Sequence, residues 1–261
     1  MRTSNVDAIQ TVSFIGAGNL ATQLALTLFE KQNEIQQIYS RTLDSASLLA
    51  SQVGAEATDN LEDISAKVDL LVISISDKAM PEVVSRLQGL NTLVVHTAGS
   101  VPMDILSSCS PRIGVFYPTQ TFTKAVRVSF DNIPLCIEAN RDIDYIRLKQ
   151  LAQLISTHVT EVSSAQRKSI HLAAVFACNF SNHMLAIADD LLQKEDLPLD
   201  ILKPLVVETI EKAFRISPKK GQSGPAIRHD QNVIAEHMVR LSDKPLFAEI
   251  YEKVTKSIQE I

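Results

Sequence analysis

The sequence predicts an α/β fold, in which a doubly wound, mostly parallel sheet precedes an all-α C-terminal domain. Apolar, β-rich runs alternate with helical patterns as far as about residue 163, which is the order that forms βαβ units. Beyond Ser163 the strand signals stop and helical patterns continue. The chain has 261 residues, 45% of them hydrophobic, which is enough for two domains of ordinary size. We therefore expect a sheet domain over residues 1–163 and a helical domain over residues 164–261.

The predicted strands are short apolar runs bounded by turn residues. The run over residues 69–75 is almost continuously apolar, which is typical of a strand covered on both faces. In chain order the predicted strands are residues 11–15, 35–39, 69–75, 92–96, 112–116, 132–138 and 159–162.

The predicted helices carry apolar side chains at spacings of three and four. Such a stripe from Leu20 to Leu28 marks the first helix, and Thr42 is the expected N-cap of a second one that ends at Val53. A loop rich in Pro, Gly and polar residues covers residues 217–225. The remaining predicted helices are residues 144–155, 165–194, 198–216, 225–241 and 245–259.

A glycine turn joins the first predicted strand to the first predicted helix. Glycine has no Cβ, so its backbone N–H groups can approach a phosphate that the positive end of the helix attracts. Rossmann dinucleotide-binding domains have their phosphate turn at this place, although Ala21 replaces the third glycine here. The alternative is a tight turn without a ligand. The residues predicted to bind the pyrophosphate are Gly16, Ala17, Gly18, Asn19 and Leu20.

The end of the second predicted strand indicates which dinucleotide binds. An acidic side chain there would bind the ribose of NAD, but the chain has Ser40, Arg41 and Thr42 instead. A guanidinium and two hydroxyls suit a 2′-phosphate, so the sequence predicts NADP (NADPH) as the cofactor. The alternative is that Arg41 is a solvated surface charge and that the hydroxyls only cap a helix.

Two more strand ends are expected at the same edge of the sheet, where open α/β sheets bind ligands. For Asp77, a contact with the cofactor ribose and a role as helix cap remain equally open. His96 is placed to face the nicotinamide or the substrate, although a lone histidine at a strand end is more often structural. The cofactor-binding residues predicted at these strand ends are Ile75, Ser76, Asp77, Thr97, Ala98 and Gly99.

The helical region offers side chains for a substrate. His171 and Asn179 are eight residues apart, so on one α-helix they share a face, and histidine titrates in the range needed of a proton donor. Arg228 suits a carboxylate or phosphate. The alternatives are buried polar groups satisfied by neighbouring helices and a structural salt bridge from Arg228 to Asp230. The predicted catalytic residues are therefore His171, Asn179, Arg228 and His96.

Composition limits the other function classes. The formal net charge of −5 gives no reason to expect a nucleic acid or an anionic membrane as partner. Cys109, Cys136 and Cys178 fit neither a disulfide framework nor a metal site, so a reducing cytoplasm is expected. Residues 169–188 contain no charged residue apart from histidine, but their His and Asn side chains argue for a buried helix or a subunit interface rather than a membrane span.

Three stretches together resemble a known family. The segments 171–180, 224–230 and 96–99 are similar to those of bacterial candidate NADP oxidoreductases, which join a Rossmann-like domain to a C-terminal helical domain of unknown function. The nucleotide half also resembles pyrroline-5-carboxylate reductase and the deazaflavin-dependent NADP reductases, through residues 15–20 and 40–42. More distantly, the architecture is similar to 6-phosphogluconate and β-hydroxyacid dehydrogenases, which implies a homodimer formed through the helical domain.

The chain also departs from these relatives. The β-hydroxyacid dehydrogenases have a catalytic lysine four residues before an asparagine, where this chain has Val175 before Asn179. The resembling family tends to have His-Pro where this chain has Tyr117 and Pro118. The expected function is NADP(H)-dependent hydride transfer to or from a small carbonyl, imine or hydroxy acid. The alternatives are a non-catalytic NADP-binding sensor and, less favoured, a reductase that uses deazaflavin as co-substrate.

Overall fold

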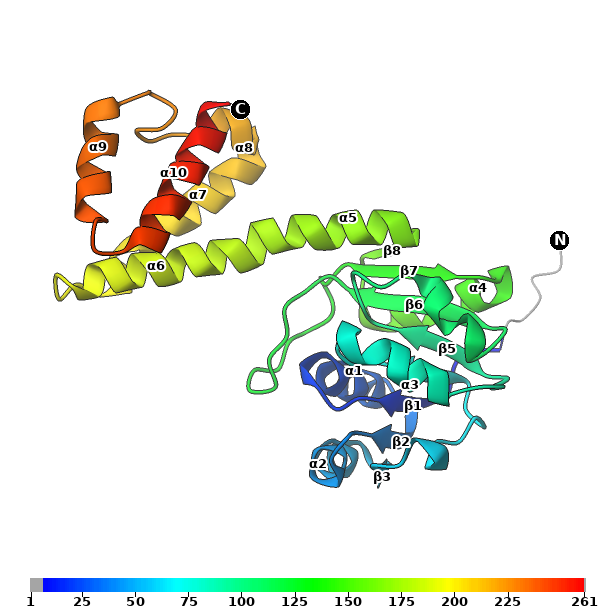
Figure 1. Cartoon of the computed structure of the whole chain (residues 1–261). Helices are drawn as coiled ribbons and strands as arrows, with labels where there is room; N and C mark the ends of the chain where they lie inside the picture. Colours follow the sequence, from blue (N-terminus) through cyan, green and yellow to red (C-terminus); the bar gives the residue numbers. More distant parts are fainter. Residues whose placement is uncertain (1–6, 261) are drawn as a thin grey trace. The chain divides into compact units, whose positions relative to one another are not determined.

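The computed structural model describes residues 7–260 (Figure 1). By its internal contacts the chain divides into two compact units, Met1–Phe176 and Ala177–Ile261. We call them the sheet unit and the helical unit. The division lies later in the chain than the boundary expected after Ser163, which stays a prediction.

The sheet unit contains one eight-stranded sheet in the order β3-β2-β1-β4-β5-β6-β7-β8. All neighbouring strands are parallel except β6 and β7. The part from β3 to β6 has the strand order of a Rossmann fold, so the predicted fold class is confirmed. The strands are β1 (Thr11–Ile15), β2 (Glu34–Tyr39), β3 (Glu56–Thr58), β4 (Leu70–Ile73), β5 (Leu93–His96), β6 (Ile113–Pro118), β7 (Leu135–Ala139) and β8 (Val159–Glu161).

Helices cover both faces of this sheet. The helices of the sheet unit are α1 (Asn19–Glu30), α2 (Leu43–Val53), α3 (Met80–Arg86), α4 (Asp142–Ile155) and α5 (Ser164–Ala174). Three 3₁₀ turns accompany them: η1 (Leu61–Asp63), η2 (Asp77–Ala79) and η3 (Met103–Ser108). The helices predicted over 20–28, 42–53 and 144–155 correspond to α1, α2 and α4.

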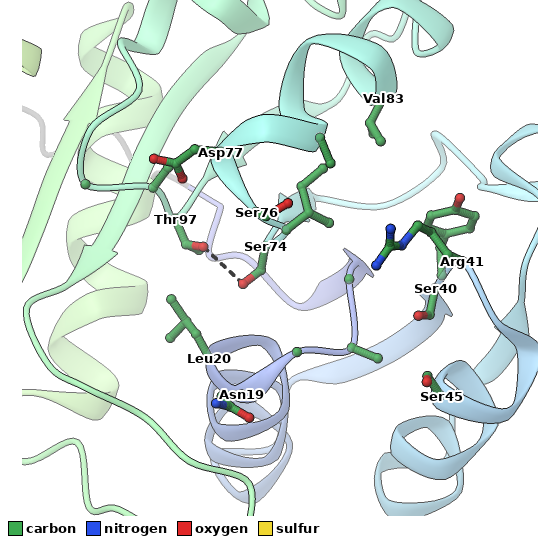
Figure 2. A pocket seen from close by; sticks show the side chains of 18 residues that line it. Asn19, Leu20, Ser40, Arg41, Ser45, Ser74, Ser76, Asp77, Val83 and Thr97 are labelled. Atoms are coloured by element: carbon green, nitrogen blue, oxygen red, sulfur yellow. Dashed lines mark hydrogen bonds between the residues drawn. The ribbon is translucent and has the colours of Figure 1, made fainter.

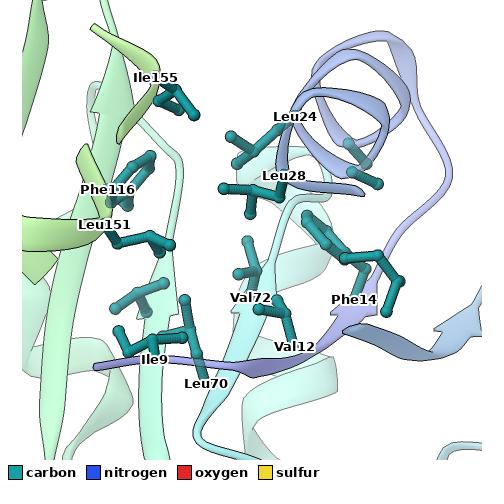
Figure 3. Close-up of a cluster of buried hydrophobic side chains, with 14 of the residues drawn as sticks. Ile9, Val12, Phe14, Leu24, Leu28, Leu70, Val72, Phe116, Leu151 and Ile155 are labelled. Atoms are coloured by element: carbon teal, nitrogen blue, oxygen red, sulfur yellow. The ribbon is translucent and has the colours of Figure 1, made fainter. Parts of the chain in front are cut away.

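Two apolar cores hold the layers together, because successive side chains of a strand point to opposite faces. Val72 of β4 packs with Leu24 of α1 and Leu151 of α4 in one core (Figure 3). Ile73, the next residue of β4, packs with Val84 of α3 in the other core. Burial of β4 on both faces explains its continuous apolar sequence.

The helical unit consists of short and medium helices. Its elements are the end of the π-helical segment η4 (Val175–Phe180), α6 (Ser181–Gln193), η5 (Leu199–Leu202), α7 (Lys203–Ile216), α8 (Pro218–Gly221), α9 (Gln231–Arg240) and α10 (Pro245–Gln259). Only Ala226 and Leu241 have buried apolar side chains among its described residues. Large apolar side chains such as Phe214, which is 90% exposed, therefore remain uncovered in the single chain.

Several sequence-based boundaries need correction. The helix expected over 165–194 is interrupted by η4, so the α-helical spacing does not continue from His171 to Asn179. The helix expected from residue 225 begins at Gln231, because residues 225–229 form turns and Asp230 accepts a hydrogen bond from the N–H of Val233 as N-cap.

One helical run is long and apolar. Ser164–Gln193 spans 30 residues with a mean hydropathy of 1.3 in its most apolar window, so by length and composition it is sufficient to cross a membrane. A single helix of this kind is weak evidence for a membrane span.

Candidate cofactor-binding site

The turn after β1 requires glycine at its first position. Gly16 has φ of +119°, and its N–H donates to the carbonyl oxygen of Tyr39 over 2.8 Å. A Cβ on Gly16 would lie 2.1 Å from the carbonyl oxygen of Ser74, so only glycine lets β1, β2 and the end of β4 come together here.

Gly18 has a different role, because a Cβ there would meet nothing within 4 Å. It is the N-cap of α1, with φ of −76° and no side chain to cap the helix, and the first turn of α1 has no acidic residue. The amino end of α1 therefore faces open space with its partial positive charge uncompensated. This is the environment that a pyrophosphate requires.

A cavity of about 510 Å³ extends from this turn along the carboxyl ends of β1, β2, β4 and β5 (Figure 2). It lies where the strand order reverses, between β1 and β4, which is the ligand crevice of doubly wound sheets. Its lining residues are Gly16, Ala17, Gly18, Asn19, Leu20, Tyr39, Ser40, Arg41, Ser45, Ser74, Ile75, Ser76, Asp77, Ala79, Val83, Thr97, Ala98 and Gly99.

The cavity brings together nearly all the residues predicted to bind the cofactor. Thr42 is the exception, because it is exposed and is not part of the lining. It is the N-cap residue of α2, but its hydroxyl donates to Oγ of Ser45 over 2.8 Å rather than capping the backbone. Ser45, which was not among the predicted residues, thus takes the predicted place of Thr42 in the lining.

One end of the cavity is lined by the positively charged side chain of Arg41 and by two serines. Ser40, Arg41 and Ser45 lie there together in Figure 2. Arg41 is exposed and forms no ion pair within residues 7–260, so its guanidinium is available to a ligand. Two hydroxyls beside a guanidinium suit the 2′-phosphate of NADP.

The other end is formed by the loops after β4 and β5. The Thr97 hydroxyl donates to Oγ of Ser74 over 3.0 Å and joins the two loops. The Asp77 carboxylate accepts a hydrogen bond from the hydroxyl of Ser100. Asp77 is the first residue of η2, whose N-cap is Ser76, so the helix-cap interpretation of Asp77 is not the one observed.

Two polar side chains converge on Gly99 at this end. A Cβ on Gly99 would lie 2.6 Å from Nδ1 of His171 and 3.0 Å from the Tyr117 hydroxyl oxygen. The hydroxyl oxygen and Nδ1 are themselves 3.5 Å apart, and both side chains are partly exposed. The predicted residue His171 therefore lies beside the cavity lining, together with a tyrosine that was not among the predicted site residues.

His96 lies in the core and not in the cavity lining. Its side chain is fully buried, and Nδ1 accepts the N–H of Ala98 over 3.1 Å, while Nε2 lacks a hydrogen-bond partner in the described chain. Burial, aided by the nearby Arg167 guanidinium, lowers the pKa of His96 to about 4. A neutral, buried imidazole that holds the loop after β5 fits this environment better than a proton donor does.

The other two predicted catalytic residues belong to the helical unit. Asn179 lies in η4 and Arg228 in the turn before α9, and both are exposed. Within the described residues Arg228 forms no ion pair, because Asp230 caps α9 instead of pairing with it. Asn179 and Arg228 belong to a different unit from the cavity residues, and their roles stay predictions.

Five lining residues were not predicted from the sequence: Tyr39, Ser45, Ser74, Ala79 and Val83. Tyr39 and Ser74 directly adjoin predicted residues at strand ends, so the rule that selected Ser40 and Ile75 would have found them. Ala79 and Val83 have small apolar side chains without a chemical signature. No group of three or more His, Cys, Asp or Glu side chains that could hold a metal ion occurs between residues 7 and 260.

Fold and site together define a dinucleotide-binding protein of the Rossmann class. Family models extend this assignment over both halves of the chain. The model described as "NADP oxidoreductase coenzyme F420-dependent" matches residues 11–98, and a domain of unknown function, DUF2520, matches residues 133–258. The chain matches no curated protein.

Solved structures agree with this assignment. A candidate NADP oxidoreductase from Bacteroides fragilis is 45% identical over 97% of this chain and 99% of its own, with a TM-score of 0.91. The chain therefore belongs to the NADP oxidoreductase family that combines these two domains, and its cofactor is NADP(H).

Two more distant structures share the fold. A pyrroline-5-carboxylate reductase from Coxiella burnetii is 18% identical, covers 97% of each chain and has a TM-score of 0.58. An imine reductase from Myxococcus stipitatus, solved with NADP⁺, is 12% identical over 96% of this chain and 93% of its own, with a TM-score of 0.66.

Proposed function

We propose that this protein is an NADP(H)-dependent oxidoreductase that transfers a hydride to or from a small carbonyl, imine or hydroxy acid. The observation that carries the proposal is the cavity. The glycine turn after β1 and Arg41, unpaired within the described residues, line it, and Tyr117 and His171 lie beside its end at Gly99. Among the structures that share the fold are a pyrroline-5-carboxylate reductase and an imine reductase, which supports the inclusion of imines in the substrate class.

Different cavity residues are proposed to bind different parts of the cofactor. The backbone of Gly18 and the amino end of α1 bind the pyrophosphate, and Arg41 with Ser40 and Ser45 binds the 2′-phosphate. The loops containing Asp77 and Thr97–Gly99 surround the nicotinamide riboside. When bound, NADPH supplies the hydride, while the protein supplies orientation and a proton.

His171 is the proposed source of that proton, since it adjoins Gly99 and an imidazole ring can both donate and accept a proton. Asn179 and Arg228 of the helical unit are proposed to bind the substrate's polar groups. In this proposal these side chains perform the task of the catalytic lysine of the β-hydroxyacid dehydrogenases. At the position of that lysine this chain has Val175.

The protein is further proposed to be a cytoplasmic homodimer formed through the helical unit. Exposed apolar side chains lie along α7 and α10, including Leu205, Phe214 and Leu246, which are 64%, 90% and 62% exposed. Apolar surface of this extent is typical of a protein interface. A second chain would cover it and would also account for the apolar exterior of Ser164–Gln193.

The test is a substrate panel followed by the absorbance of reduced nicotinamide. Cyclic imines, 2-oxo acids and aldehydes are offered with NADPH, and hydroxy acids with NADP⁺. The expected result is turnover with one of these classes, confirmed by identification of the product. Tight NADPH binding without turnover of any class would contradict the proposal and favour the sensor. Turnover only after deazaflavin is added would favour the deazaflavin-coupled reductase, in line with the name of the family model.

A further inference from the structure

Tyr117 and His171 form a pair next to Gly99, a position of the cavity lining at which only glycine fits. A Cβ at Gly99 would lie within 3.0 Å of both the Tyr117 hydroxyl oxygen and Nδ1 of His171. The missing side chain of Gly99 therefore lets these two polar atoms pack directly against the backbone of the cavity lining. Gly99 itself is a lining residue, so nothing but its backbone separates the pair from the cavity at this point.

Tyr117 reaches this place because of its position in the sheet. It is the penultimate residue of β6, two residues after Val115, which is paired with His96 at the end of β5. Neighbouring parallel strands have their carboxyl ends at the same edge of the sheet, so Tyr117 lies next to the loop that follows His96. The tyrosine ring meets the imidazole ring edge-on, with ring centroids 6.5 Å apart.

His171 is held against the same loop by the helix that carries it. Arg167 is one turn earlier on α5, fully buried, and donates to the carbonyl oxygens of Ala98 and Val101 over 3.2 Å and 2.6 Å. It also pairs with Glu138 of β7 over 2.5 Å. Arg167 thus anchors α5 to both sides of Gly99, which keeps His171 in place next to Tyr117.

We propose that Tyr117 is a catalytic residue, whose hydroxyl delivers the proton to the substrate's oxygen or nitrogen while His171 restores it. This inference rests on the proposed reduction. The O–H bond of Tyr117 breaks as an O–H or N–H bond forms on the substrate, whose carbon receives a hydride, which carries two electrons, while NADPH is oxidised to NADP⁺. The phenolate then takes a proton from Nδ1 of His171, and the imidazole ring takes up one solvent proton in its place, so that each turnover consumes one proton from solution.

The surroundings of Tyr117 keep its hydroxyl protonated until it is used. Burial raises the pKa of Tyr117, as do Cys136 on β7 and Asp77 on η2, whereas Arg167 on α5 lowers it. With the His171 imidazole, these are the titratable and charged groups that face the hydroxyl from β7, η2 and α5. A protonated phenol at neutral pH is a donor, as the proposed step requires.

The first test needs only the cofactor. The NMR signal of the Tyr117 ring carbon that bears the hydroxyl is identified by its loss in Tyr117→Phe and titrated with NADPH or NADP⁺ bound. Oxidised nicotinamide carries a positive charge that favours the phenolate, so Tyr117 should ionise about one pH unit lower with NADP⁺ than with NADPH. Tyr145 on α4 serves as the internal control and should ionise equally with both cofactors. Equal ionisation of Tyr117 with both bound cofactors would overturn the proposal, whereas a failure of both cofactors to bind would refute the proposed function instead.

The second test uses the substrate that the panel identifies. Tyr117→Phe should lower kcat about 10²- to 10⁴-fold, leave NADPH affinity within about threefold and abolish the solvent isotope effect on hydride transfer. His171→Gln should slow only the restoration of the proton, seen as slower steady-state turnover after a normal first turnover. Tyr145→Phe should behave as wild type. A Tyr117→Phe enzyme with kcat within about threefold of wild type would contradict the assignment.

Discussion

Arg41 is the side chain on which the cofactor preference depends. It is exposed at the cavity end and forms no ion pair within the described chain, so its charge is free for the 2′-phosphate. Arg41→Ala should weaken NADPH binding about 10- to 100-fold, because a charge-assisted hydrogen bond to a phosphate is lost, and should leave NADH binding unchanged. Calorimetric titration measures both affinities, with Arg141→Ala as the control. Equal losses for NADPH and NADH would show that Arg41 does not bind the 2′-phosphate.

The lowered pKa of His96 predicts that the stability of the folded protein depends on pH. Its folded-state pKa of about 4 lies below the ordinary value of 6.5, so the unfolded chain binds more protons between these two pH values. The folded state should therefore lose up to about 3 kcal/mol of stability from this group as the pH falls through that window. Denaturant unfolding at pH 7 and pH 4.5 measures the loss.

His96→Asn should reduce this loss, since the amide oxygen can accept the N–H of Ala98 but does not titrate in this range. The exposed His158, changed to Gln, provides the control and should leave the pH dependence as in wild type. An unchanged pH dependence in His96→Asn would show that another group is responsible.

At the scale of single residues, sequence patterns identified the side chains next to strand ends but not those that packing brings together. Gly18, Arg41 and Thr97 come directly after strands or their turns, and the ends of parallel strands share one edge. Tyr117 stands out in the sequence only as a departure from a family pattern. Its site role depends on α5 packing against the loop after β5, which no local pattern encodes.

The β1-turn-α1 element allows a matched pair of substitutions. Gly18→Ala should fold normally, because φ is −76° and the Cβ meets nothing, but should weaken NADPH binding by about tenfold or more where that Cβ intrudes on the pyrophosphate. Gly16→Ala should instead lower the free energy of unfolding by about 1–3 kcal/mol, because its Cβ would overlap the carbonyl of Ser74. Thermal unfolding and calorimetry distinguish the two effects. Wild-type NADPH affinity in Gly18→Ala would place the phosphates elsewhere.

Sequence patterns predicted the long elements well and the short or irregular ones poorly. The three residues of β3 are too few for a recognisable alternation, so this edge strand was missed. The π-helical turn η4 has the composition of the α-helices beside it, and hydrophobic periodicity does not distinguish an i to i+5 turn within six residues. Asp230 displays the N-cap signal of α9, but the apolar residues before it extended the predicted helix too early.

For the whole molecule, the uncovered apolar side chains of the helical unit predict a dimer. Sedimentation should give the mass of two chains, and Phe214→Asp should shift the equilibrium toward one chain because a charge replaces a buried contact. Leu154→Asp, at an apolar residue of α4 that is 52% exposed, is the control and should leave the dimer intact. A wild-type protein with the mass of one chain at all concentrations would refute the dimer.

The cavity at the switch point of the sheet is proposed to bind NADP(H) with the reactive end of the cofactor beside Gly99 and Tyr117. A crystal structure of the full chain grown with NADPH is the sharpest test of this arrangement. We predict the pyrophosphate at the N–H groups after Gly18, the 2′-phosphate at Arg41 and the nicotinamide next to Gly99. Density for the cofactor outside this cavity, or with its 2′-phosphate turned away from Arg41, would contradict the proposed arrangement.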